Sequence, residues 1–173
     1  MKIVVAATHS TGKTTFCKKI AKRKGYNYIH DIVREEAVKK GFAINENTPP
    51  EVQDWLITRQ WELEKTTPEP WIADKCLFDY LVYGDLVLKD EGIDKLMKEI
   101  IRYFVDKNAK YDIVFYMPPE IPLEEDGVRS IDPEFQRKVD AHYREVLDER
   151  GIKYITITGS VKERVKKALE HLK

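Results

Sequence analysis

The residues best suited to chemistry stand near the amino terminus, where Gly12, Lys13 and Thr14 follow a run of small and hydroxylated side chains. Residues 7–14 fit the pattern G-x-x-x-x-G-K-[ST], except that Ala7 replaces the first glycine. In this pattern backbone N–H groups surround phosphate oxygens, the lysine bridges the β- and γ-phosphates, and the hydroxyl ligates Mg²⁺. The sequence therefore predicts a phosphate-binding loop; the alternative is a strand-to-helix turn that happens to contain Gly-Lys-Thr.

The pattern also indicates which side chains should surround ATP and Mg²⁺. Lys13 is expected to act on the transferred phosphate, and Thr14 is expected to hold the metal ion. Alanine at position 7 is compatible with a tight turn if its φ is negative there. The residues expected to bind ATP are Thr8, His9, Ser10, Thr11, Gly12, Lys13, Thr14, Thr15, Arg129 and Gly159.

Two aspartates follow apolar runs and are candidates for the rest of the chemistry. Asp74 ends residues 71–74 and Asp31 follows residues 26–30, so both are expected at the carboxyl edge of a sheet. Asp74 is predicted to be the second metal anchor, and Asp31 a general base that accepts a proton from an attacking hydroxyl. Each has an alternative role as the cap of the helix that follows it.

Two arginines could contact the substrates. Arg34 lies one helical turn beyond Asp31 and is predicted to bind a polar or anionic acceptor, unless it only pairs with a neighbouring carboxylate. Arg129 belongs to the segment Asp-Gly-Val-Arg-Ser at residues 126–130, inside a charged loop at residues 118–132. Gly127 permits a hinge, so this loop is predicted to be a lid that carries Arg129 over the phosphates. The alternative is an ordinary surface loop.

Alternating strands and helices must position these residues. Short β-branched runs predict strands at residues 2–7, 26–30, 71–74, 112–117 and 152–158. Helical spacing and helix-end signals predict helices at residues 12–24, 32–40, 49–67, 78–89, 93–108 and 134–150, and after Ser160. Short connections between them imply right-handed βαβ units. The predicted fold is α/β, a three-layer α/β/α arrangement of the P-loop NTPase type with a parallel five-stranded sheet, in a single domain over residues 1–173.

Taken in order along the chain, these features resemble a known group of enzymes. The phosphate loop, the pair Arg34-Glu35, Asp74 and residues 126–130 resemble the P-loop kinases typified by the ribosylnicotinamide kinase domain of the bifunctional NAD-biosynthesis regulator. The resemblance covers nearly the whole chain, and residues 126–130 give it most of its specificity. It implies phosphate transfer from ATP to a nucleoside hydroxyl.

The resemblance also implies roles for single residues. Lys13 and Arg129 would contact the phosphates, Thr14 and Asp74 would hold Mg²⁺, and an acid near Asp31 would meet the acceptor. Related kinases often have arginine beside the strand-three acid, whereas Lys75 stands here and is expected at the substrate. Lysine keeps the positive charge but loses the bidentate fork of arginine. Residues 42–67, where an acceptor pocket would form, have no close counterpart, so the acceptor stays open.

Composition excludes several other classes of protein. The chain has 173 residues, of which 42% are hydrophobic and 35% charged, and its 30 basic residues balance its 30 acidic ones. A strongly basic nucleic-acid-binding domain is therefore not expected. No apolar run reaches the ~18–20 residues of a membrane span, and residues 1–7 are too short for a secretory signal. Cys17 and Cys76 cannot build a disulfide framework or a four-ligand zinc site. We expect a cytoplasmic protein with a small-molecule substrate, compatible with a homo-oligomer.

Three functions remain open on the sequence alone. The first is a kinase for a small-molecule hydroxyl, with ribosylnicotinamide as the best single candidate. The second is an ATPase or nucleotide-dependent regulatory module, and the third is a nucleotide sensor in which the aspartates serve only as caps. A GTPase is excluded, because no guanine-selecting Asn-Lys-x-Asp segment is present.

Overall fold

Five parallel strands form one sheet in the order β2-β3-β1-β4-β5. The structure is a computed structural model that describes residues 1–42, 48–122 and 132–172. In chain order the strands are β1 (Lys2–Ala6), β2 (Asn27–Ile29), β3 (Trp71–Ala73), β4 (Ile113–Tyr116) and β5 (Ile155–Thr156). The parallel five-stranded sheet predicted from the sequence is confirmed.

The pairing of β1 determines where the functional residues can meet. β1 lies between β3 and β4, with Val4 opposite Ala73 and Ala6 opposite Tyr116. β3 also pairs with β2, where Ile29 is opposite Ala73. Because all these strands are parallel, the loops that leave β1, β2 and β3 emerge side by side at one edge of the sheet.

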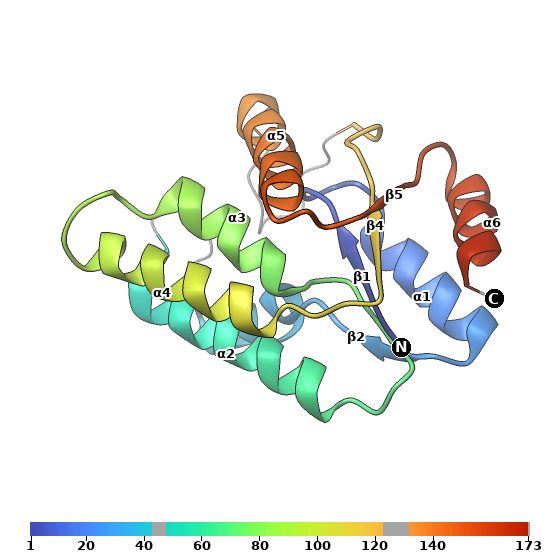
Figure 1. Cartoon of the computed structure of the whole chain (residues 1–173), viewed down its shortest axis with the longest axis horizontal. Coiled ribbons are helices and arrows are strands. Elements are labelled where there is room, and N and C mark those ends of the chain that lie inside the picture. Colours follow the sequence, from blue (N-terminus) through green and yellow to red (C-terminus); the bar gives the residue numbers. More distant parts are fainter. Residues whose placement is uncertain (43–47, 123–131, 173) are drawn as a thin grey trace.

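Helices cover both faces of the sheet (Figure 1). α1 and α6 pack together on one face, and α2, α3, α4 and α5 lie on the other. Within the described ranges, no helix is long and apolar enough to cross a membrane. The helices are α1 (Lys13–Lys24), α2 (Pro50–Thr66), α3 (Leu77–Val87), α4 (Gly92–Asn108), α5 (Pro133–Glu149) and α6 (Val161–His171).

The alternation of side chains along β1 joins the two halves of the core. Val4 and Ala6 are buried among residues of the α2–α5 side. Ile3 and Val5 point the other way and are buried among residues of the α1 and α6 side. A central strand that is apolar on both faces is typical of a parallel sheet covered by helices on each side.

Two predicted elements differ from the structure. Residues 32–40, predicted as a helix, form a π-helical turn (η1, Val33–Ala37) followed by a 3-10 turn (η2, Val38–Lys40). The N–H of Val38 bonds to the carbonyl of Val33, five residues back, which widens the turn. The last strand was predicted over residues 152–158, but β5 has only two residues. β5 lies at the end of the sheet and pairs only with β4, so few backbone hydrogen bonds extend it.

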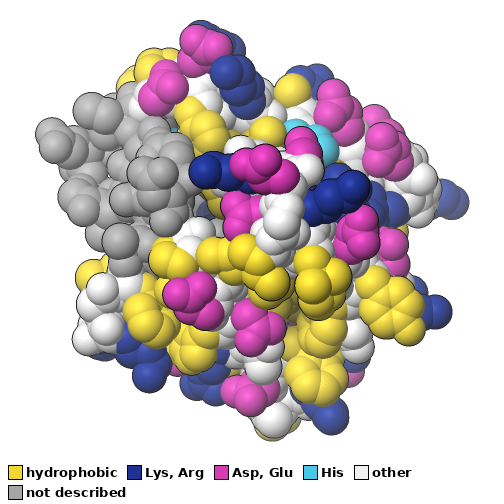
Figure 2. Space-filling view, turned by 90° about the vertical axis from the view of Figure 1, so that its left-hand side faces the viewer, with side chains coloured by type: hydrophobic (Ala, Val, Ile, Leu, Met, Phe, Trp, Pro, Cys, Tyr) yellow, Lys and Arg dark blue, Asp and Glu magenta, His cyan; other side chains and the backbone are white. Residues whose placement is uncertain are grey.

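One helix carries a second apolar side that is not in the core. Ile101 and Val105 of α4 are buried, whereas Ile93, Leu96, Ile100 and Tyr103 are exposed, Tyr103 by 68%. The exposed residues follow the spacing i, i+3, i+7, i+10 and therefore lie along one stripe. Figure 2, which looks at the molecule from the left of Figure 1, shows hydrophobic side chains gathered below the centre of that face.

A buried polar network fixes the start of α3, just after β3. Tyr111 donates its hydroxyl proton to Glu64 of α2 and accepts the N–H of Leu77 at 3.0 Å. Gln60 donates to Glu64 at 3.0 Å and to the carbonyl of Lys75 at 2.7 Å. Burial raises the pKa of the Glu64 carboxyl to about 7, against the hydrogen bonds that Gln60 and Tyr111 supply. The network therefore connects α2 to the turn that carries Asp74 and Lys75.

The pKa of Glu64 predicts a pH-dependent stability. An acid whose pKa is higher in the fold than in the unfolded chain stabilises the fold at low pH, and this contribution is lost as the pH rises through the folded pKa. With a pKa raised from 4.5 to about 7, the free energy of unfolding should fall by about 3 kcal/mol between pH 5 and pH 8. Glu64→Gln should abolish most of this fall in denaturant titrations.

Glu62→Gln is the matched control, because Glu62 lies on the same helix but is exposed. That variant should keep the pH dependence of the wild type. An unchanged pH dependence in Glu64→Gln would contradict the assignment of the titration to Glu64.

Candidate functional site

The loop between β1 and α1 has the backbone shape that its sequence predicts. Gly12 has a φ of 82° and Ser10 a φ of 57°, both in the left-handed region. A Cβ atom at Gly12 would lie 3.2 Å from Cδ1 of Ile121, so glycine also serves the close packing here. Ala7 is not among the residues with positive φ, which is why alanine can replace the first glycine of the pattern.

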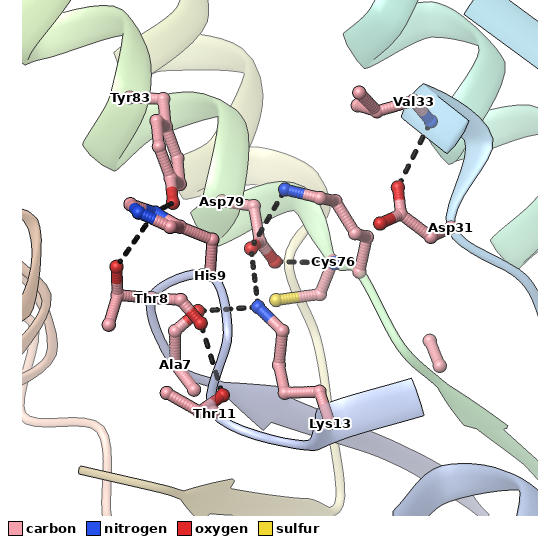
Figure 3. A network of polar contacts seen from close by, with 12 residues as sticks. Ala7, Thr8, His9, Thr11, Lys13, Asp31, Val33, Cys76, Asp79 and Tyr83 are labelled. Carbon is pink, nitrogen blue, oxygen red and sulfur yellow. Dashed lines mark hydrogen bonds and ion pairs between the residues drawn. The ribbon is translucent and has the colours of Figure 1, made fainter. Parts of the chain in front are cut away.

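Lys13 lies in a buried cluster of charges at the mouth of this loop (Figure 3). Its ammonium donates to the carbonyl of Ala7 and lies 3.4 Å from Oδ1 of Asp79. Lys75 contacts the same oxygen at 3.5 Å, and its ammonium stands 5.0 Å above the ring centre of Tyr83. One fully buried carboxylate therefore faces two ammonium groups.

Asp79 was not predicted from the sequence, although it holds this cluster together. It lies in the first turn of α3, where Oδ2 accepts the N–H of Cys76 at 2.8 Å. Burial opposes the ionisation of Asp79, but Lys13 and Lys75, together with the hydrogen bond from Cys76 and the influence of Tyr143, hold the pKa of the carboxyl below its usual range. The three-residue spacing of Cys76 and Asp79 could have indicated a helix cap, but no pattern indicates the contact with Lys13.

Asp74 and Thr14, the predicted metal anchors, lie close enough for Thr14 to lower the pKa of the Asp74 carboxyl. Asp74 is buried directly after β3, and its carboxylate accepts the hydroxyl of Tyr28 at 3.1 Å. Burial raises the pKa of Asp74, Lys13 opposes this shift, and Asp31 adds to it. The alternative role of Asp74 as the cap of α3 is not seen, because Asp79 makes the side-chain contact with the N-cap N–H instead.

The donor atoms of this pair fit a magnesium ion. Mg²⁺ prefers oxygen ligands and usually takes one or two from the protein and the others from water and substrate phosphates. Thr14 and Asp74 offer a hydroxyl and a carboxylate side by side. In the part of the chain that the structure describes, no group of three or more His, Cys, Asp or Glu could hold a metal. A cation here would therefore depend on phosphate and water oxygens.

Asp31 lies beside this group rather than within it. It follows β2, is buried, and accepts the N–H of Val33 at 3.0 Å, which is the capping role considered above. Figure 3 shows its carboxylate set apart from the contact between Lys13 and Asp79. Because β2 and β3 are parallel and Ile29 is opposite Ala73, Asp31 and Asp74 follow their strands at the same edge of the sheet, and Asp31 raises the pKa of Asp74. Arg34 is exposed in η1.

Aromatic and polar side chains from other helices cover the phosphate loop. Nδ1 of His9 lies 3.2 Å from the hydroxyl of Thr8 and 3.1 Å from that of Tyr83. The His9 ring stacks on Phe135 at the start of α5, with ring centres 6.4 Å apart. Gln136, the next residue, donates its amide to the carbonyl of His9 at 3.0 Å.

Gly159 is brought near the loop through two side chains, Glu120 and Arg164, that no sequence pattern indicates. Its N–H donates to Glu120 at 2.9 Å, and Glu120 also accepts a hydrogen bond from Nη2 of Arg164 at 2.8 Å. Nη1 of Arg164 donates a hydrogen bond to the carbonyl of Thr11 in the phosphate loop. Thr15, predicted beside the nucleotide, is exposed in the first turn of α1. Residues 126–130 with Arg129 lie outside the described residues, so the lid stays a prediction.

A comparison with protein families decides the membership of this chain. Residues 2–164 match the model of the family described as AAA domain. The chain belongs to the AAA-domain family. No curated protein gives a significant match to this AAA domain.

Solved structures share its fold over nearly the whole chain. The NadR protein in complex with NR has a TM-score of 0.79 at 21% identity, with 99% of this chain covered but only 50% of the NadR chain. Deoxyadenosine kinase from M. mycoides has a TM-score of 0.72 at 18% identity, over 99% of this chain and 98% of the kinase. Thymidylate kinase from Ehrlichia chaffeensis has a TM-score of 0.67 at 14% identity, over 100% and 98%. The α/β P-loop fold predicted from the sequence is confirmed.

The buried cluster around Asp79 predicts a large loss of stability on neutralisation. Asp79→Asn keeps the shape and an acceptor for Cys76 but removes the negative charge that faces the ammonium groups of Lys13 and Lys75. We expect the free energy of unfolding to fall by about 3 kcal/mol, measured by denaturant titration at neutral pH. Adding Lys75→Met should restore part of the loss, because one of the two positive charges beside position 79 is then removed.

Glu134→Gln serves as the control, because Glu134 and its partner Lys138 are both exposed. It should change stability little. Wild-type stability in Asp79→Asn would show that the cluster does not require the carboxylate.

Proposed function

We propose that this chain is a kinase that uses ATP and Mg²⁺ to phosphorylate a hydroxyl of a small molecule, with ribosylnicotinamide as the best candidate acceptor. The proposal rests on the proximity of Asp74 to Lys13 and Thr14, at the sheet edge where β1 and β3 end side by side. The fold shared with nucleoside and nucleotide kinases supports it, and the NadR complex with NR supports this choice of acceptor.

The nucleotide side of the proposed reaction rests on electrostatics. The loop amides and the N-terminus of α1 would bind the phosphates, and the ammonium of Lys13 would contact their β- and γ-oxygens. Lys13 and Lys75 now share one carboxylate, so an arriving polyphosphate would supply further negative charge to a cluster rich in ammonium groups. Thr14 and Asp74 would hold Mg²⁺, which neutralises charge on the phosphates when bound. Residues 8–15 and Gly159 would contact the nucleotide. Arg129, in the loop at 118–132, would contact its phosphates.

The acceptor side rests on Asp31 and its neighbours. Asp31 would take the proton of the attacking hydroxyl, because it is a buried carboxylate one strand away from Asp74. Arg34 and Lys75 would bind polar groups of the acceptor. Asp31 also caps η1 through Val33, and this contact fixes its orientation.

The direct test is ATP consumption with Mg²⁺ across separate acceptors: ribosylnicotinamide, nucleosides and nucleoside monophosphates. One acceptor should stimulate turnover and give a product heavier by one phosphate, seen by mass spectrometry. Lys13→Ala should lose this activity, because the loop then lacks its cation at the phosphates. Slow hydrolysis that is the same with every acceptor would contradict the kinase and favour an ATPase or a sensor.

The role of Asp31 predicts a selective loss of turnover. In Asp31→Asn the side chain can still accept the N–H of Val33 but can no longer take a proton, so kcat should fall roughly 10²–10⁴-fold. The Kd for ATP, measured by calorimetry, should stay near that of the wild type. Glu35→Gln, at an exposed neighbouring carboxylate, is the control and should keep its activity. Full activity in Asp31→Asn would remove the general base from the proposal.

A further inference from the structure

The carbonyl groups of the phosphate loop are held by hydrogen bonds from several directions. Within the loop and its helix, the ammonium of Lys13 binds the carbonyl of Ala7, and the hydroxyl of Thr11 binds the carbonyl of Thr8 at 3.1 Å. These contacts are local, because the residues stand at most six positions apart. They leave the carbonyls of His9 and Thr11 to be held by other parts of the molecule.

Two buried side chains from distant helices hold those carbonyls. Gln136, in the first turn of α5, donates Nε2 to the carbonyl of His9 at 3.0 Å. Arg164 of α6 donates Nη1 to the carbonyl of Thr11. These donors stand 127 and 153 residues away along the chain from the residues that they hold. Both are more than nine-tenths buried, so water does not compete for the contacts.

The planarity of the peptide bond converts these contacts into a direction for the next amide. In a trans peptide, the carbonyl of one residue and the N–H of the next point to opposite sides. Holding the carbonyls of His9 and Thr11 therefore directs the N–H groups of Ser10 and Gly12 away from Gln136 and Arg164. Ser10 and Gly12 are the two loop residues with positive φ. Backbone N–H groups in such conformations form concave anion sites.

The strained backbone of Ser10 and the buried charge of Arg164 both cost free energy, which indicates a role beyond packing. Ser10 is a non-glycine residue at a φ of 57°, which persists only where the surroundings hold it. Arg164 is 1% exposed, and its Nε finds no hydrogen-bond partner among the residues that the structure describes. A buried guanidinium is a poor choice for stability alone, since an apolar side chain avoids its desolvation.

Glu120 holds Arg164 in place from the segment after β4. Its carboxylate accepts hydrogen bonds from Nη2 of Arg164 at 2.8 Å and from the N–H of Gly159 at 2.9 Å. Both contacts lower the pKa of Glu120, and the hydrogen bond from Gly159 has the larger effect. The guanidinium is thereby fixed between a carboxylate and the Thr11 carbonyl.

We propose that Gln136 and Arg164 are positioning residues that set the Ser10 and Gly12 amides of the phosphate loop for binding a polyphosphate. The inference rests on the proposed nucleotide-binding function and deepens it. Neither side chain is assigned a contact with the ligand; each acts through the carbonyl that it holds.

The test measures the binding of inorganic tripolyphosphate and of ATP by calorimetry, because tripolyphosphate has no base or ribose. Gln136→Met removes the donor while keeping the length of the side chain, and Arg164→Lys keeps the charge but can serve only one of the two partners well. Both variants should bind tripolyphosphate and ATP about tenfold more weakly than the wild type. With the acceptor found for the wild type, KM for ATP should rise, while kcat and the KM for the acceptor stay near wild-type values.

The controls separate the failure of this inference from the failure of the proposed function. Arg144→Met, at an exposed arginine of α5 paired with Asp140, should bind both ligands like the wild type. If the wild type binds neither ligand, the proposed function itself fails. If the wild type binds both and the folded Gln136→Met and Arg164→Lys variants bind tripolyphosphate equally well, the inference is overturned. A loss for ATP alone would also overturn it, since the two residues would then act on the base or ribose.

Discussion

The contact between Lys13 and Asp79 is the interaction on which the candidate site depends. A buried ammonium needs a compensating charge, and Asp79 supplies it from the first turn of α3 while also facing Lys75. The pair connects the helix that follows β1 with the helix that follows β3. It keeps the ammonium of Lys13 against the carbonyl of Ala7, at the mouth of the phosphate loop, before any phosphate arrives.

The fold supplies this contact through strand order. Because β1 lies directly beside β3 in a parallel sheet, the phosphate loop and Asp74 leave the sheet at the same edge. The network of Glu64, Gln60 and Tyr111 then fixes the turn between β3 and α3 from the side of α2. Stability and site geometry are therefore linked. Glu64 and Tyr111, which help to fix this turn, are also groups whose pKa is raised by burial.

The parts of the site that follow local rules could be predicted from the sequence. The phosphate loop is a contiguous pattern between a strand and a helix, and Asp74 and Asp31 follow apolar runs that end at one sheet edge. Asp79, Gln136 and Arg164 could not be predicted, because they meet Lys13, His9 and Thr11 across 66, 127 and 153 residues. Local pattern also failed for residues 32–40, where the sequence has helical spacing but the backbone takes a wider π turn. The fold class was accessible because the alternation of strands and helices is itself a local signal.

The most direct test of the account is a crystal structure with Mg²⁺ and a non-hydrolysable ATP analogue. The polyphosphate should lie in the loop of residues 7–14, with the ammonium of Lys13 on its oxygens and the metal between Thr14 and Asp74. A nucleotide bound elsewhere, or a Lys13 that still faces only Ala7 and Asp79 while the loop holds no phosphate, would contradict it.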